Sequence, residues 1–188
     1  MTESELIQNL KQQKEAAFTK LVKQYQDQVV NTCFGFVHDA EDARDLAQEV
    51  FVEVYHSIRK FREEAGLGTW LYRIAVNKSL DFIRRKNRKK RFGIHMRVGK
   101  LDATDQVELA GRVDNPHAQL EEKERFVLLR KAIARLPENQ RIAITLQKFE
   151  ECPSTKIAEI MNTSVAAVES LLYRAKANLY QQLEKRLR

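Results

Sequence analysis

Glycine and proline are scarce in this sequence. The chain of 188 residues has 6 glycines and 3 prolines, less than half of the roughly 12% that average usage supplies. β-Sandwiches, β-barrels and the phosphate-binding loops of nucleotide-binding α/β folds all depend on these residues for their turns. The shortage therefore predicts an all-α protein.

Metal-ligand patterns and long apolar runs are also missing. Neither of the two cysteines, Cys33 and Cys152, has another Cys or His at metal-ligand spacing. We interpret both as small buried or half-buried apolar residues, and we expect no metal and no cofactor. No apolar run approaches the roughly 18–20 residues needed to cross a bilayer, and residues 1–5 are too acidic for a secretory signal. We therefore expect a cytoplasmic protein.

Catalytic signatures are not evident either. The four histidines form no pair at helical spacing, and the chain contains no glycine-rich phosphate loop. A helical enzyme therefore has no support in the sequence. We expect a protein that is not an enzyme and has no small-molecule substrate.

The charge that is present is divided between the two ends of the chain. The 33 Lys and Arg residues exceed the 26 Asp and Glu residues, for a net charge of +7. Residues 1–93 and 121–188 each have a net charge of +4, whereas residues 94–120 have −1. A basic protein favours polyanionic partners, either nucleic acid or an anionic membrane. Two basic segments favour two nucleic-acid surfaces, since a membrane-binding protein needs only one basic amphipathic face.

The middle of the chain has the composition of a linker. Residues 93–116 hold three of the six glycines and several aspartates, and they have no sustained helical period. We interpret residues 94–116 as a flexible linker. The predicted architecture is two helical domains, residues 1–93 and 117–188.

Capping residues mark the predicted helices before the linker. Thr2 and Glu5 are spaced as a capping box, and Asp39 and Thr69 each precede an apolar pattern with helical period. After the first short helix, the expected helices span residues 16–37, 40–61 and 70 to about 91, with a loop over 62–68.

The helix over residues 40–61 has an acidic face although the protein is basic. Its apolar residues form one stripe, and Asp45, Gln48, Glu49 and Glu53 lie off that stripe. Such a face is commonly just solvated. The alternative is a docking surface for a basic or polar protein partner, because these carboxylates would repel nucleic acid.

The next helix ends in a run of cations. Seven of the eight residues from 84 to 91 are Lys or Arg. Cations at a helix C-terminus interact favourably with the helix dipole, but seven are more than that interaction requires. The run favours binding to phosphates over nuclear targeting or a merely solubilising tail.

The C-terminal segment has the proportions of a helix-turn-helix. Helices are expected over residues 118–135, from Pro137 as the first helical residue to about 149, over 154–161, and from 165 to the chain end. Only residues 162–164 separate the last two, and Ser164 can cap the second of them. In a helix-turn-helix, the second helix enters the major groove and presents its N-terminal residues to base edges.

In this order, these segments resemble the extracytoplasmic-function (ECF) sigma factors, small members of the sigma-70 family built from conserved regions two and four. The resemblance covers nearly the whole chain. The resemblance rests on residues 39–51, Phe61, 68–77, Leu136–Pro137, 156–161 and 164–179.

The resemblance implies a promoter-specificity subunit that binds core RNA polymerase, reads and melts the minus-10 element, and reads the minus-35 element. The implied partners are the β′ clamp helices and the β flap of core polymerase, promoter DNA, and an anti-sigma factor. The polymerase contacts would be Asp45, Gln48, Glu49 and Glu53.

The implied DNA contacts fall into two groups. Those for the minus-10 element are Arg62, Arg73, Asn77, Lys78, Arg84, Arg85, Lys86 and Arg88. Those for the minus-35 element are Thr155, Lys156, Ser164, Val165, Ala166, Glu169, Ser170, Tyr173, Arg174 and Lys176.

Some residues depart from the family pattern. Ala167, Glu169 and Leu172 stand where similar recognition helices often have Thr, a basic residue and Arg. Glu169 cannot bind a phosphate favourably, although it can accept a hydrogen bond from a cytosine amino group. Glu63 and Glu64 also cannot be phosphate ligands, so a base pocket in the 62–68 loop must use backbone or other side chains.

A different hypothesis is an autonomous helix-turn-helix regulator that binds an operator as a dimer. It leaves the helix at Trp70 and the acidic face unexplained, and no dimerisation heptad is evident.

Overall fold

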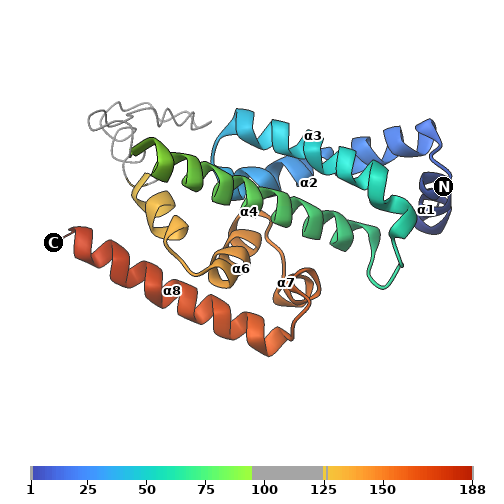
Figure 1. Ribbon diagram of the computed structural model, residues 1–188. Coiled ribbons are helices and arrows are strands. Elements are labelled where there is room, and N and C mark those ends of the chain that lie inside the picture. Colours follow the sequence, from blue (N-terminus) through green and yellow to red (C-terminus); the bar gives the residue numbers. More distant parts are fainter. Residues whose placement is uncertain (1, 95–124, 126, 188) are drawn as a thin grey trace, which may run out of the picture.

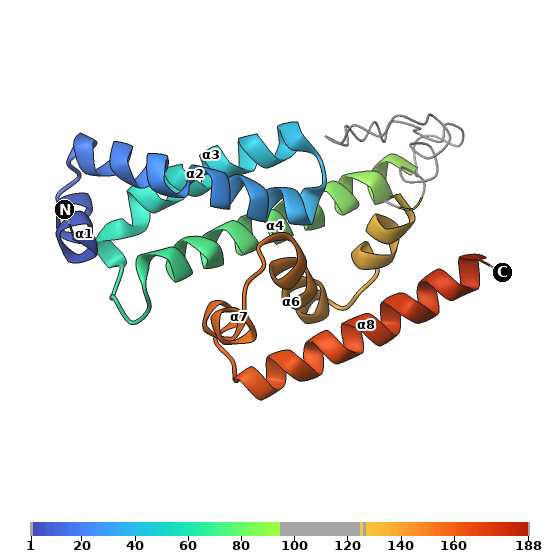
Figure 2. The ribbon, with the colours of Figure 1, turned by 180° about the vertical axis from the view of Figure 1, so that it is seen from behind.

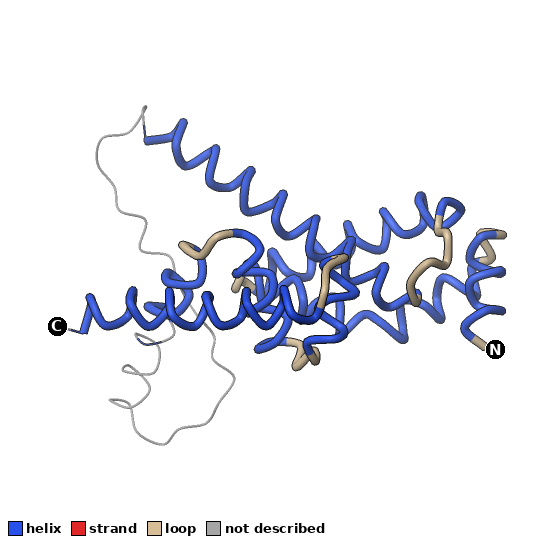
Figure 3. The backbone as a smooth tube through the Cα atoms, turned by 90° about the horizontal axis from the view of Figure 1, so that it is seen from below, coloured by secondary structure: helices blue, strands red, loops and turns tan. Residues whose placement is uncertain are grey.

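The described part of the chain is built from helices and connecting loops. The computed structural model describes residues 2–94, 125 and 127–187. Within these ranges no strand is present, as Figure 3 shows. The all-α prediction is confirmed. Apart from residue 94, the predicted linker lies outside the described residues.

The N-terminal half, residues 2–94, begins with the predicted capping box. In α1 (Glu3–Lys11) the Thr2 hydroxyl accepts from the Glu5 N–H, and the Glu5 carboxylate accepts from the Thr2 N–H. Helices α2 (Glu15–Val37) and α3 (Ala40–Ser57) follow, and a 3-10 turn, η1 (Ile58–Lys60), ends α3. Asp39 caps α3 as predicted, because its carboxylate accepts from the N–H groups of Glu41 and Asp42.

Helix α4 (Leu67–Ile94) begins earlier than predicted. Thr69 lies inside its first turn and is fully buried, so the prediction that Thr69 is the N-cap is wrong. The Glu3 carboxylate of α1 accepts from the Leu67 N–H at 3.0 Å. A side chain 64 residues away thus satisfies the start of this helix, and no local pattern could indicate it.

The C-terminal half contains a helix over residues 127–134, then α6 (Glu138–Phe149), α7 (Ser154–Met161) and α8 (Val165–Leu187). Pro137 has extended backbone (φ −51°, ψ 144°) and is the N-cap of α6, one residue before its predicted helical role. Asn162, in the left-handed conformation, ends α7. Ser164 then accepts from the Ala167 N–H at 3.2 Å, which confirms its prediction as a cap.

The two halves pack into one hydrophobic core. Helix α4 lies along α2 and α3 on one side and against α7 on the other, while α6 packs on α2 (Figures 1 and 2). Helix α8 covers α6 and α7 from outside. Cys33 and Cys152 are buried, as predicted.

The two halves approach each other closely at Gly35 of α2. A Cβ atom at this position would lie 2.9 Å from Cγ2 of Thr145 and 3.1 Å from Cβ of Phe149, both on α6. Such distances are too short for carbon atoms, so the absence of a side chain allows α6 to approach α2.

We expect the substitution Gly35→Ala to loosen the packing of the two halves. Overpacking costs about 1–3 kcal/mol, which corresponds to a decrease in Tm of roughly 2–10 °C for a chain of this size. Thermal unfolding and the radius of gyration from small-angle X-ray scattering measure the effect. Gly68→Ala is the matched control, because a Cβ there meets Tyr25 at 3.4 Å, an ordinary contact. Equal effects of the two substitutions would contradict the close approach.

Candidate functional site

The predicted polymerase-binding residues lie on one exposed face of α3. Asp45, Gln48, Glu49 and Glu53 are all exposed. Val52 lies among them and is 56% exposed. Sequence reasoning did not single out Val52, although its spacing from Gln48 and Glu49 places it on the same face.

Cations of α4 pair with carboxylates of α3. Lys78 lies 3.3 Å from Glu53, Arg85 lies 3.9 Å from Glu49, and Lys86 lies 2.9 Å from Asp42. The structure therefore brings residues predicted to bind polymerase next to residues predicted to bind DNA. Exposed pairs of this kind are worth roughly 0–1 kcal/mol each, so a partner can replace them.

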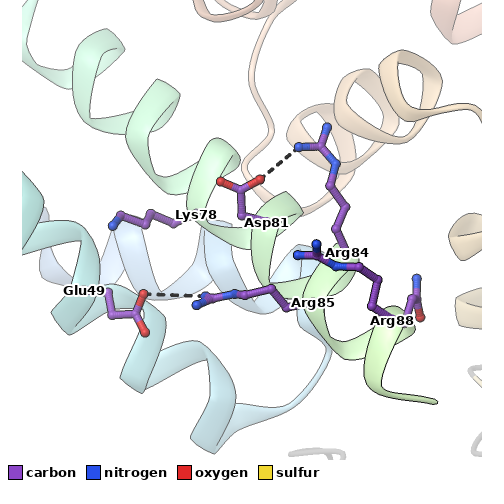
Figure 4. A pocket seen from close by; sticks show the side chains of 7 residues that line it. Glu49, Lys78, Asp81, Arg84, Arg85 and Arg88 are labelled. Atoms are coloured by element: carbon purple, nitrogen blue, oxygen red, sulfur yellow. Dashed lines mark hydrogen bonds and ion pairs between the residues drawn. The ribbon is translucent and has the colours of Figure 1, made fainter. Parts of the chain in front are cut away.

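An open groove of about 780 Å³ runs between these two helices (Figure 4). Its lining residues are Glu49, Lys78, Asp81, Arg84, Arg85, Asn87 and Arg88.

Two arginines of this groove differ in how they are engaged. The Arg84 guanidinium donates to Asp81 at 2.9 Å and to both carboxylate oxygens of Glu138 on α6, at 2.6 and 2.7 Å. It therefore links the two halves. Arg88 is exposed and forms no hydrogen bond or ion pair with the described residues. Arg88 is thus the groove cation best placed to meet a phosphate.

The loop before α4 encloses a cavity of about 180 Å³. Phe61 and Trp70 form one wall, with ring centroids 4.9 Å apart, and the side chains of Arg62 and Arg73 also line it. Aromatic rings beside guanidinium groups form a stacking surface for a nucleobase. Glu63 and Glu64 also line the cavity, so the aromatic and guanidinium side chains are the groups that can contact a base and its phosphate.

Arg73 does more than line this cavity. Its guanidinium donates to the carbonyls of Glu159, at 2.7 Å, and Ile160, at 3.3 Å, near the C-terminus of α7. A cation is favourable there because unsatisfied carbonyls give the helix end partial negative charge.

Lys156 of α7 makes a reciprocal contact. Its ammonium donates to the buried Thr69 hydroxyl and lies 3.3 Å from the Glu159 carboxylate. Arg73 and Lys156, predicted for two different DNA elements, thus hold the two halves of the chain together.

The rest of the predicted minus-35 surface faces solvent. Ser170 is half-buried, and the other members are exposed: Thr155, Ser164, Val165, Ala166, Glu169, Tyr173, Arg174 and Lys176. Glu169 accepts from the Ser154 hydroxyl, and Arg174 donates to the Ser170 hydroxyl at 2.6 Å. Tyr173 is 76% exposed. The residues of the predicted minus-10 surface not yet placed, Arg62 and Asn77, are exposed as well.

Comparisons with known proteins match both halves of this architecture. The family profile "Sigma-70 region 2" matches residues 21–89, and "Sigma-70, region 4" matches residues 126–179. The RNA polymerase sigma-H factor of Pseudomonas aeruginosa is 31% identical, over 99% of this chain and 96% of its own. The chain belongs to the ECF sigma factors of the sigma-70 family. The ECF RNA polymerase sigma-E factor of Haemophilus influenzae is 30% identical, over 98% and 96% of the two chains.

Solved sigma-factor structures share the fold. CnrH, in complex with the cytosolic domain of CnrY, is similar with a TM-score of 0.65 at 21% identity, over 97% of each chain. The sigma factor RpoE of Bartonella quintana, in complex with the anti-sigma factor NepR, is similar with a TM-score of 0.59 at 18% identity, over 89% of this chain and 96% of RpoE.

A buried carboxyl group lies where the two halves of this sigma factor meet. The Tyr72 hydroxyl of α4 donates to Oε2 of Glu150 at 3.2 Å, and the buried Oε1 has no hydrogen-bond partner among the described residues. Burial raises the pKa of the Glu150 carboxyl to about 7, although the Tyr72 hydrogen bond acts in the opposite direction. Burial also raises the pKa of Cys33 to about 11, and raises the pKa of Tyr72.

We expect the contribution of Glu150 to the packing of the halves to fall as the pH rises. When the halves are apart, Glu150 is solvated and has its ordinary pKa near 4.5. The raised pKa in the packed state means that the contribution of Glu150 to the packing is fully present below pH 4.5, and that this contribution is lost progressively as the pH rises through 7. The measurement is Tm between pH 5.5 and 8.

The substitution Glu150→Gln should flatten this pH dependence, because an amide does not ionise. Glu151→Gln is the control, since Glu151 is an exposed neighbour and its loss should leave the dependence in place. A Glu150→Gln variant with an unchanged pH profile would contradict the assignment.

Neither metal binding nor membrane insertion is indicated by the described residues. No group of three His, Cys, Asp or Glu side chains within residues 2–94, 125 and 127–187 could hold a metal ion. In the same ranges, no helix combines the length and hydropathy needed to span a bilayer.

Proposed function

We propose that this sigma factor docks on core RNA polymerase through α3, captures single-stranded minus-10 DNA with the loop before α4, and places α8 in the major groove of the minus-35 element. It would act in the cytoplasm and use the catalytic centre of the polymerase rather than one of its own. The observation that chiefly supports the proposal is the aromatic loop cavity, because it has the walls that an extruded base requires.

The loop cavity supports recognition of a base outside the duplex. A base that leaves the stack needs a π surface and a nearby cation for its phosphate. The half-buried Trp70, backed by the buried Phe61 ring, supplies the first, and Arg62, 83% exposed at its side chain, supplies the second. Asn77, Lys78 and Arg88 continue the polar and basic surface along α4 toward the next phosphates.

Helix α8 supports recognition of a duplex. Its first turns are exposed and follow a tight turn after α7, as in a helix that enters the major groove. Glu169 can accept from a cytosine amino group if it leaves Ser154. Tyr173, Arg174 and Lys176 are placed for phosphate contacts.

The α3 face supports docking on a basic protein surface. Exposed carboxylates surround Val52, and Tyr55 is 39% exposed on the same helix. An apolar centre with a charged rim is typical of protein interfaces. Val52 and Tyr55 extend the predicted contact set of Asp45, Gln48, Glu49 and Glu53.

The contacts between the halves imply that DNA binding requires them to separate. Arg73 and Lys156 are engaged at the interface, and Arg84 is held by Glu138. We propose that residues 1–93 and 117–188 act as two domains joined by a linker over 94–116. Because CnrH and RpoE were solved with CnrY and the anti-sigma factor NepR, we also propose an anti-sigma factor as a partner.

Transcription in vitro tests the proposal. With purified core polymerase and a panel of promoter fragments, we expect the protein to co-elute with core and direct specific initiation. Trp70→Ala should weaken binding to single-stranded minus-10 DNA by about 1–3 kcal/mol, the usual value of one stacked base. Trp70→Phe is the control that keeps a ring. Absence of both co-elution and specific initiation would favour the autonomous regulator instead.

Salt dependence tests the groove on α4. We expect Arg88→Gln to lower the slope of log K against log salt concentration for holoenzyme–DNA binding by roughly 0.7–0.9, the effect of one lost phosphate contact. Lys23→Gln, an exposed cation on α2, removes the same charge and should leave the slope unchanged. If the two variants have the same slope, Arg88 does not contact phosphate.

A further inference from the structure

A second cavity, remote from the loop and from the α3 face, lies between the two halves. It has a volume of about 210 Å³ and opens where the C-terminal end of α2 and the middle of α4 meet the helix over 127–134 and the start of α6. Because both halves supply its walls, it exists only while the halves are packed together.

The floor of this cavity is apolar. Phe36 of α2, Ile83 of α4 and Ile133 of the helix over 127–134 line it. Phe36 and Ile133 are 5% and 7% exposed, so the floor is part of the core rather than a patch of surface. A ligand with a short hydrocarbon or aromatic body can displace water from such a floor.

The charged side chains that line the cavity are all cationic. They are Lys86, Arg130, Lys131 and Arg141, and no carboxylate is among the described lining residues. The remaining titratable group is His38. Burial, and secondarily Arg130, lower its pKa to about 4, so His38 is neutral at physiological pH. Lys86 is paired with Asp42 at 2.9 Å, but the lining side chains still carry an excess of positive charge, which favours an anion.

Arg141 supplies a donor without an acceptor. One terminal nitrogen donates to the Ala134 carbonyl at 3.3 Å, but the buried Nε–H has no partner among the described residues. Burial lowers the pKa of this guanidinium, which shows that its charge is poorly solvated. The Nε–H is shielded from the cavity as well as from water, so a ligand meets the guanidinium through the atoms of Arg141 that line the cavity, and its charge favours an anion.

From the apolar floor, the cationic lining and the half-buried Arg141 guanidinium, we infer that this cavity binds a small amphipathic carboxylate, with the carboxylate at Arg141 and the apolar body on Phe36, Ile83 and Ile133. The cavity is smaller than the roughly 300–1,000 Å³ of pockets for drug-sized ligands. A medium-chain fatty acid or a simple aromatic acid has the appropriate size.

Such a ligand affects the whole chain. It binds only the packed arrangement, so it shifts the population toward that arrangement and away from the separated halves. By reciprocity, any partner or condition that separates the halves lowers the affinity of the cavity for the ligand. The cavity thereby couples a small acid to the availability of both proposed DNA-binding surfaces.

Octanoate is the probe for a binding test on the full chain. With isoleucine methyl groups labelled for NMR, we expect saturable shifts at Ile83 and Ile133, little change at the distant Ile7, and a Kd on the order of 1 mM. Octan-1-ol should bind at least about tenfold more weakly, and octylammonium should not bind. Equal affinity for octanoate and octan-1-ol, or no saturable shift, would overturn the inference.

Three variants locate the site. Arg141→Gln should weaken octanoate about tenfold or more, whereas Arg135→Gln removes an exposed cation outside the lining and should not. Ala134→Phe fills the cavity from an exposed position with Arg141 intact, so it should abolish binding even if Arg141→Gln fails to fold. Unchanged octanoate affinity in Ala134→Phe, or equal losses in the two arginine variants, would refute the assignment. The readout is binding alone and does not depend on transcription.

Discussion

The hydrogen bonds from Arg73 of α4 to the carbonyls that end α7 join the two halves of the protein. Around them lie the Gly35 contact with α6, the buried Glu150 carboxyl beside Tyr72, and the Arg84 pair with Glu138. This interface determines which cations of a basic protein are free to meet DNA. The small cavity and the pH-sensitive carboxyl exist only because these surfaces are in contact.

Helix α4 contacts both α3, which has the proposed polymerase-binding face, and α7, which belongs to the proposed minus-35 reader. One side of α4 pairs with the carboxylates of α3, and the other contacts α7. Each exposed ion pair is weak, so a protein or nucleic-acid partner can exchange with it. The proposed partners of α3, the loop cavity and α8 would therefore act on one connected structure.

Local patterns predicted most of the helices because their causes are local. The Thr2 capping box, the Asp39 cap and the tight turn before Ser164 each depend on neighbouring residues. The start of α4 could not be predicted in this way, because Glu3 of α1 satisfies the Leu67 N–H. Val52 was missed for a related reason, since apolar character alone does not show which face of a helix is left uncovered.

The sequence alone determined the all-α class, the family, and the presence of an acidic face in a basic chain, because composition, helical period and motif order are properties of the chain itself. Only the tertiary structure decided how those residues are engaged. The sequence shows that Arg73, Lys156 and Arg84 are cations, but it does not show their partners, which lie 86, 87 and 54 residues away along the chain. Whether a charged side chain is paired or buried depends on distances in space. These distances cannot be read from the spacing of residues in the sequence.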